Sequence, residues 1–185
     1  MTGPLVVPAA WDDPDVQRLT AAQQVELRNR YDGAGEPGTP PSAADVGVVL
    51  MARDGDGTVL GCGALRQLGG DVAELKRMYV VPDARGRGVS KALLAGLEAA
   101  AAVRGWSTLR LETGPRQPEA IGLYERAGYR PIAAFGATPV QWTPSTRCST
   151  SGFSTRADLL VTRGAGRLIA RAGAPGVRVV PASRS

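Results

Sequence analysis

Residues 81–90 read Val81-Pro82-Asp83-Ala84-Arg85-Gly86-Arg87-Gly88-Val89-Ser90 and join a strand-like apolar run to a helical pattern. Glycines in such a loop let the backbone approach a ligand closely, and successive N–H groups can converge on one point. The N-terminus of the helix that follows adds positive electrostatic potential. Arg85 and Arg87 can add charge-assisted hydrogen bonds to phosphate oxygens. The segment therefore predicts a phosphate-binding loop.

The spacing within this loop excludes two common phosphate-binding motifs. A Walker loop requires Gly-Lys followed by Ser or Thr, whereas Lys91 is preceded by Ser90 and followed by Ala92. A dinucleotide fingerprint requires a third Gly or Ala where this chain has Lys91. Glu112 does lie about twenty residues further on, as that fingerprint expects. The strands predicted before the loop are nevertheless antiparallel, which argues against a βαβ unit.

Three apolar runs before the loop predict strands joined by short turns. They cover Val46–Arg53, Thr58–Gln67 and Val72–Val81. The segment Asp54-Gly55-Asp56-Gly57 between the first two runs is a strong hairpin signal. Because short turns connect antiparallel strands, these runs predict a meander.

Helical spacing of apolar residues occurs on both sides of this meander. Asp12 or Asp13 as N-cap and Pro14 in the first turn predict a helix over about 14–31, and a long Gly- and Pro-containing loop follows it. After the phosphate loop we expect a helix, a strand, a helix and a strand: Ser90–Arg104, Ser107–Thr113, Pro118 to Gly128, and a strand from Tyr129. The predicted fold class is α/β (α+β), with a mixed, mostly antiparallel central sheet flanked by helices.

Missing residue types exclude several kinds of chemistry. The chain of 185 residues contains no His, and its two Cys, Cys62 and Cys148, are isolated in the sequence. A His base, a Ser-His or Cys-His nucleophile and a His-ligated metal are therefore excluded, and two isolated Cys argue against a zinc site. We expect no metal, and acid–base chemistry must rely on Glu, Asp, Tyr, Lys or water.

Positive charge is concentrated after residue 135. The net charge is +5, from 22 basic and 17 acidic residues; residues 136–185 hold seven Arg and one acid, Asp158, leaving 15 basic and 16 acidic residues before them. Residues 136–185 also show no sustained strand or helix period. We therefore predict two regions, a domain over 1–135 and a basic Arg/Ser/Pro/Gly-rich tail over 136–185 that is weakly ordered or aberrant. Its composition resembles a GC-rich gene translated out of frame, so we hypothesise a frameshifted or replaced C-terminus.

The phosphate loop and the strands beside it resemble the GNAT superfamily of acetyltransferases. Residues 85–90 match the family's pyrophosphate loop, [QR]-x-x-G-x-[GA], except that Ser90 stands where Gly or Ala is usual. Residues 73–80 resemble the family's central strand, which splays from its neighbour, and residues 109–113 resemble the strand across the splay. This resemblance implies a GNAT-like acyl-CoA N-acyltransferase fold.

A further family motif follows. Residues 117–129 are similar to N-x-x-A-x-x-L-Y-x-x-x-G-[FY], with Gln117 where Asn is usual, so the resemblance covers about residues 5–135. It implies acetyl-CoA as co-substrate. The residues implied in binding acetyl-CoA come from the end of the predicted strand 72–81, from the phosphate loop, and from the start of the helix predicted at Pro118. They are Met78, Tyr79, Val80, Arg85, Gly86, Arg87, Gly88, Val89, Ser90, Gln117, Ala120 and Tyr124.

The same resemblance implies two catalytic residues. Glu74 matches the position of a frequent general base, acting directly or through a water, and Tyr124 has a hydroxyl that can protonate the departing thiolate. Each residue also has a purely structural interpretation. Glu74 can be a strand carboxylate paired with Lys76 or Arg77, and Tyr124 can be a core aromatic at helical spacing.

The implied function is transfer of an acetyl group from acetyl-CoA to a primary amine of a small molecule or peptide. Two alternatives stay open: a non-catalytic acyl-CoA-binding module, and nucleic-acid binding through the Arg-rich tail, for which the sequence offers charge but no motif. No apolar run reaches the roughly 18 residues of a membrane span, and the N-terminus lacks a signal-peptide pattern, so we expect a cytoplasmic protein without a membrane partner. A homodimer is possible, and the sequence does not identify the amine.

Overall fold

A computed structural model describes residues 3–33, 39–132 and 151–156. The elements follow the chain in this order: β1 (Leu5–Pro8), α1 (Pro14–Arg30), β2 (Val46–Arg53), β3 (Val59–Gly69), β4 (Val72–Val80), a 3₁₀ turn (Pro82–Ala84), α2 (Val89–Val103), β5 (Thr108–Thr113), α3 (Pro118–Arg126), β6 (Arg130–Ile132) and β7 (Ser151–Arg156). The helices and strands predicted up to residue 132 are all present, with ends that differ by one or two residues. Among the described residues, no helix is both long and apolar enough to cross a membrane.

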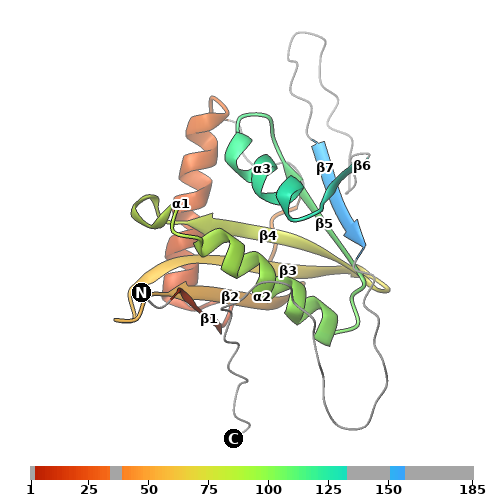
Figure 1. Ribbon diagram of the computed structural model, residues 1–185, viewed down its shortest axis with the longest axis horizontal. Helices are drawn as coiled ribbons and strands as arrows, with labels where there is room; N and C mark the ends of the chain where they lie inside the picture. The colour runs from red at the N-terminus through yellow and green to blue at the C-terminus, as the bar shows by residue number, and fades with distance from the viewer. Residues whose placement is uncertain (1–2, 34–38, 133–150, 157–185) are drawn as a thin grey trace, which may run out of the picture.

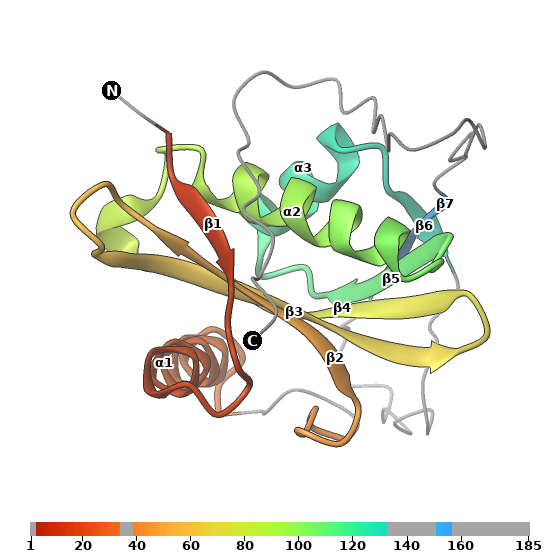
Figure 2. The ribbon, with the colours of Figure 1, turned by 90° about the horizontal axis from the view of Figure 1, so that it is seen from below.

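The strands form one sheet in the order β1-β2-β3-β4-β5-β7-β6. Every neighbouring pair is antiparallel except β4 and β5, which are parallel. Helix α1 lies on one face of this sheet, and α2 and α3 lie on the other (Figure 2). The predicted mixed, mostly antiparallel sheet flanked by helices is therefore confirmed.

The parallel pair opens after a short contact. Strands β4 and β5 are paired only at Val72↔Thr108, Ala73↔Leu109 and Glu74↔Arg110. Beyond these pairs β4 continues to Val80 and β5 to Thr113, and the two strands diverge toward α2 and α3 (Figure 1). We call this opening the splay. The last paired residue of β4, Glu74, marks its closed end.

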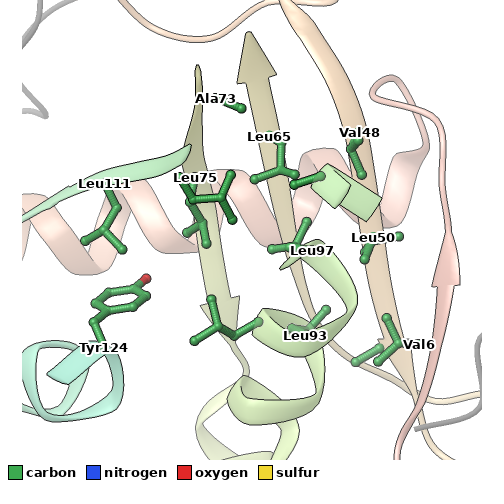
Figure 3. Packing of buried hydrophobic residues seen from close by; sticks show 14 of the residues in the cluster. Val6, Val48, Leu50, Leu65, Ala73, Leu75, Leu93, Leu97, Leu111 and Tyr124 are labelled. Carbon is green, nitrogen blue, oxygen red and sulfur yellow. The ribbon is translucent and has the colours of Figure 1, made fainter. Parts of the chain in front are cut away.

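The core explains why the helices cover both faces. Leu93, Leu94 and Leu97 form a buried stripe on α2, as their spacing predicts, and pack against Leu65 and Leu75 of the sheet (Figure 3). On the other face a smaller cluster lies beneath α1. Its buried members are Val16, Val49, Met51 and Ala64. Hydrophobic burial on both faces therefore holds the sheet between two helical layers.

Strand β7 contradicts part of the expectation for residues 136–185. No strand was predicted there, yet Ser151–Arg156 pairs antiparallel with both β5 and β6. The sequence Ser-Gly-Phe-Ser-Thr-Arg has one large apolar residue and no alternation, so this strand is formed by backbone pairing on two sides rather than by a hydrophobic pattern. The remaining residues after 132, on which the frameshift and nucleic-acid hypotheses rest, lie outside the described part of the chain.

Candidate cofactor and acceptor site

The predicted phosphate loop has the backbone geometry of an anion site. Gly86 and Gly88 have φ angles of +75° and +80°, which favour glycine, and Gly88 is the N-cap of α2. The first helical hydrogen bond runs from the Ala92 N–H to the Gly88 carbonyl. Within the described residues, the N–H groups of residues 86–91 donate to no protein acceptor. They are available to a negatively charged ligand at a helix N-terminus.

The two loop arginines are held by acidic residues on neighbouring elements. Arg85 lies 2.6 Å from the Glu26 carboxylate, donates through Nε to the Val80 carbonyl at 3.1 Å, and stands over the Tyr79 ring. Arg87 lies 2.6 Å from the carboxylate of Asp54 in the β2–β3 turn. Both guanidinium groups belong to the loop. A ligand there would meet backbone N–H groups that no described residue accepts from, and arginines already paired with carboxylates.

Strand β4 is distorted where it enters the splay. Cys62 pairs with Tyr79 and Ala64 with Lys76, so Arg77 and Met78 together face a single residue of β3. Arg77 has a φ of +56°, which marks this bulge. The bulge turns part of β4 away from its ladder with β3, beside the predicted binding residues Met78, Tyr79 and Val80.

Gly61 of β3 lets the β4 backbone approach closely at Tyr79, a feature that the sequence did not lead us to predict. A Cβ atom at Gly61 would overlap the Tyr79 carbonyl oxygen. Glycine inside an apolar strand often marks such an approach of two backbones, so Gly61 and Gly63 were a usable signal.

Glu74 lies buried at the closed end of the splay, with 2% of its surface exposed. One carboxylate oxygen is 2.6 Å from Arg66 Nε, and the other is 3.1 Å from Lys76 Nζ. Arg66 also reaches Asp45 at 3.3 Å and the Thr39 carbonyl at 3.1 Å. The predicted pairing with Lys76 is confirmed, and Arg66 is a partner that the sequence did not reveal. These contacts fix the carboxylate and connect it to the loop after α1.

Tyr124 reaches the splay from the opposite face. It is buried in the main core, and its ring lies 5.6 Å from that of Tyr129. Figure 3 shows its hydroxyl directed from α3 toward Leu111 of β5 and Leu75 of β4. Burial raises the pKa of Tyr124, so the phenol keeps its proton at neutral pH. The core-aromatic interpretation is confirmed, and this position is also compatible with a proton donor.

A set of polar contacts joins α1 to the start of α3. Arg30 lies 2.7 Å from Glu26 and 2.5 Å from Glu119. The guanidinium group of Arg30 donates to the Arg116 backbone carbonyl, and that of Arg116 donates to the Arg30 carbonyl. We call Glu26, Arg30, Arg116 and Glu119 the α1–α3 clasp. Because Glu26 also holds Arg85, helix α1 contacts both sides of the splay. Sequence reasoning missed the clasp because its members are far apart in the chain.

The remaining predicted residues lie on α3. Gln117 is the N-cap residue, and its side-chain amide lies 3.5 Å from the Tyr31 hydroxyl of the α1 C-terminus. Ala120 packs against the main core one turn before Tyr124. The spacing of Gln117, Ala120 and Tyr124 places all three along one face of the helix.

Two other features lie apart from this arrangement. The described residues contain no cluster of acidic residues, Cys or His that could hold a metal ion. A small pocket of about 190 Å³ opens beside β2 and the C-terminal end of α2, the far end of that helix from the phosphate loop. This pocket lies away from the splay, which stays the candidate site.

Comparison with known proteins agrees with this geometry. The profile of the acetyltransferase (GNAT) family matches residues 11–129. The chain belongs to the GNAT family. One similar structure is a protein from Klebsiella pneumoniae, described as a candidate acyl-CoA N-acyltransferase, with 31% sequence identity. The superposition has a TM-score of 0.66 and includes 83% of this chain and 97% of the Klebsiella chain.

Two further relatives add context. An IAA acetyltransferase of Azospirillum brasilense is 43% identical over 88 residues, which are 47% of this GNAT chain and 57% of the relative. The chain thus spans little more than half the length of the curated relatives it matches. A GNAT acetyltransferase of Elizabethkingia anophelis with acetyl-CoA bound shares the fold, with a TM-score of 0.60, 16% identity and coverage of 84% of this chain and 99% of its own.

Proposed function

We propose that this GNAT chain is an N-acetyltransferase that moves the acetyl group of acetyl-CoA to a primary amine of a small molecule or peptide. The observation that carries the proposal is the splay between β4 and β5, which opens beside a loop whose N–H groups at residues 86–91 have no acceptor in the described part of the chain. A strand edge can hydrogen-bond an extended amide-containing arm, and the loop can bind the pyrophosphate. The two sites adjoin, because β4 leads directly into the loop.

The proposed reaction is direct attack. The amine nitrogen forms a bond to the thioester carbon, the carbon–sulfur bond breaks, and the products are an acetamide and CoA thiol. One proton must leave the attacking nitrogen, and one must reach the departing sulfur. Proton balance is complete if the protein accepts the first and supplies the second.

Glu74 and Tyr124 are the residues proposed for these transfers. Glu74 takes the amine proton, directly or through a water, and its fixed position at the closed end of the splay supports this role. Tyr124 donates to the sulfur from the α3 face, supported by the direction of its hydroxyl (Figure 3) and by the raised pKa that keeps it protonated. The two residues reach the splay from different elements.

The test is CoA-thiol release from acetyl-CoA in the presence of a panel of primary amines, including di- and polyamines, amino acids and amine-terminated peptides. IAA, named for the Azospirillum relative, joins the panel as a further compound. We expect release that depends on one class of amine. Calorimetric binding of CoA with no release against the whole panel would instead support the non-catalytic acyl-CoA-binding module. The cytoplasmic location and the homodimer remain predictions.

A further inference from the structure

One glutamine of α1 has its side-chain orientation fixed by β4. Gln23 Nε2 donates to the Met78 carbonyl at 2.8 Å. A carbonyl oxygen only accepts hydrogen bonds, so the amide nitrogen must face Met78 and the amide oxygen must face away from it. Met78 lies at the β4 bulge, where the strand enters the splay.

The amide oxygen of Gln23 is buried, and no described residue donates to it. The hydroxyl oxygen of Thr20 is also buried and has no hydrogen-bond partner among the described residues. Thr20 and Gln23 are three positions apart, so both side chains lie on the same face of α1, which packs against β3 and β4. Buried polar atoms are normally satisfied, and two such oxygens on one helix face form a place where a molecule with hydrogen-bond donors can bind.

The position of these oxygens complements that of the proposed proton donor. Tyr124 approaches the splay from the face covered by α2 and α3, whereas α1 covers the opposite face (Figure 2). Glu74, on the same strand as Met78, pairs with Arg66 and Lys76. Glu74 alternates along β4 with Ala73 and Leu75, which belong to the core beneath α2, so its side chain is on the α1 face. That face therefore offers a group that can accept a proton and two oxygens that can accept hydrogen bonds.

We propose that Gln23 Oε1, assisted by Thr20 Oγ1, binds and orients the attacking amine on the α1 face of the splay. This inference rests on the proposed acetyl transfer. A neutral primary amine has two N–H donors and one lone pair. Two oxygen acceptors can hold both donors and leave the lone pair directed at the thioester carbon. A hydroxyl acceptor substrate has one donor and would leave one oxygen unsatisfied, so this pair of oxygens favours amines over alcohols.

The test is a Gln23→Leu variant, which keeps the side-chain size and removes the acceptor. We expect the KM of the best amine from the thiol-release panel to rise about 10- to 100-fold, as expected for losing one hydrogen bond to a polar or charged group. The Kd of CoA, measured by calorimetry, should stay within about twofold of the wild-type value. A Gln23→Glu variant retains an acceptor oxygen and should restore part of the amine affinity.

Gln17→Leu is the matched control, because Gln17 lies on the same helix and also donates to a backbone carbonyl, that of Trp11, but is exposed and has no hydrogen bond to β4. Gln17→Leu should leave the amine KM and the CoA Kd unchanged. An unchanged amine KM in Gln23→Leu, or a loss of CoA binding equal to the loss of amine binding, overturns the inference. If Gln23→Leu has a much lower melting temperature than the wild type, Thr20→Val provides the same comparison at the second oxygen.

Failure of the inference can be distinguished from failure of the proposed function. If the wild-type protein acetylates no amine, acetyl transfer itself is refuted. If the wild-type protein is active and a folded Gln23→Leu variant keeps its amine KM, only the assignment of the amine site is wrong.

Discussion

Arg85 of the phosphate loop and Glu26 of helix α1 form an ion pair across 2.6 Å, although 58 residues separate them in the chain. Burial raises the pKa of the Glu26 carboxyl, hydrogen bonds from Arg85 and Arg30 lower it, and the net pKa lies below the ordinary glutamate value. A carboxylate beside a proposed phosphate site is unfavourable for an anionic ligand. The negative charge of Glu26 therefore repels an anionic ligand, while its ion pair with Arg85 positions a cation that would attract the same ligand.

Replacing Glu26 with Gln should strengthen CoA binding, because it removes a negative charge and releases Arg85. The pair is partly exposed, so we expect a gain of no more than about fivefold in affinity, larger at low salt than at high salt. Calorimetry with CoA measures the gain, and pantetheine, which lacks the pyrophosphate, is the control ligand that should show none. Weaker CoA binding in E26Q would mean that Glu26 positions Arg85 instead of competing for it.

Replacing Tyr124 with Phe should lower turnover by about 100-fold, because general acid catalysis typically contributes this much. CoA affinity should change little, since the ring remains. Steady-state thiol release and calorimetry measure the two quantities. Tyr129→Phe is a matched control, because Tyr129 is also buried and its ring packs against that of Tyr124. Equal turnover in Y124F and the wild type would remove Tyr124 from the mechanism.

Replacing Arg66 with Met should destabilise the fold by about 3 kcal/mol, because it leaves a buried carboxylate with one cation fewer. Arg66 is 16% exposed and Glu74 3% exposed in their side chains. Urea denaturation measures the change. Arg53→Met breaks a more exposed pair with Asp15, whose closest atoms are 3.4 Å apart, and should cost at most about 1 kcal/mol. Similar costs for the two variants would show that the Glu74 cluster adds little stability.

The α1–α3 clasp should make stability sensitive to acid. Burial raises the pKa of Glu119, contacts with Arg30 lower it, and the net shift is downward, as for Glu26. A carboxyl whose pKa is lower in the folded state stabilises the fold above its unfolded pKa, about 4.3 for glutamate, and this contribution is lost as pH falls through the folded pKa. We therefore expect the free energy of unfolding to fall below about pH 5.

Urea denaturation of the wild type and of Glu119→Gln, from neutral pH to below about pH 4, measures how the free energy of unfolding depends on pH. The variant should be less stable at neutral pH and should lose less stability on acidification. A wild-type profile that rises toward low pH, or identical slopes for the two proteins, would contradict the assignment.

The sequence predicted those parts of the fold that depend on local patterns. The helix over Val89–Val103 follows from its leucine spacing, and the loop before it from its glycines. Contacts between distant segments could not be predicted, because neither spacing nor composition records them: Arg66 with Glu74 is one example, and Glu26 with Arg85 is another. Strand β7 was missed for a related reason, since its partners, and not its own residues, determine its conformation.

Helix α1 holds one side of the splay through Glu26 and the other through Arg30. One turn of helix separates these residues, a rise of about 6 Å. That turn is therefore a rigid spacer between the phosphate loop and the start of α3. Lengthening or kinking it would change how wide the splay opens while leaving every residue proposed to touch the substrates unaltered. With the thioester bound in the splay as proposed, the selectivity of the site for larger acyl groups would then change from a position outside it.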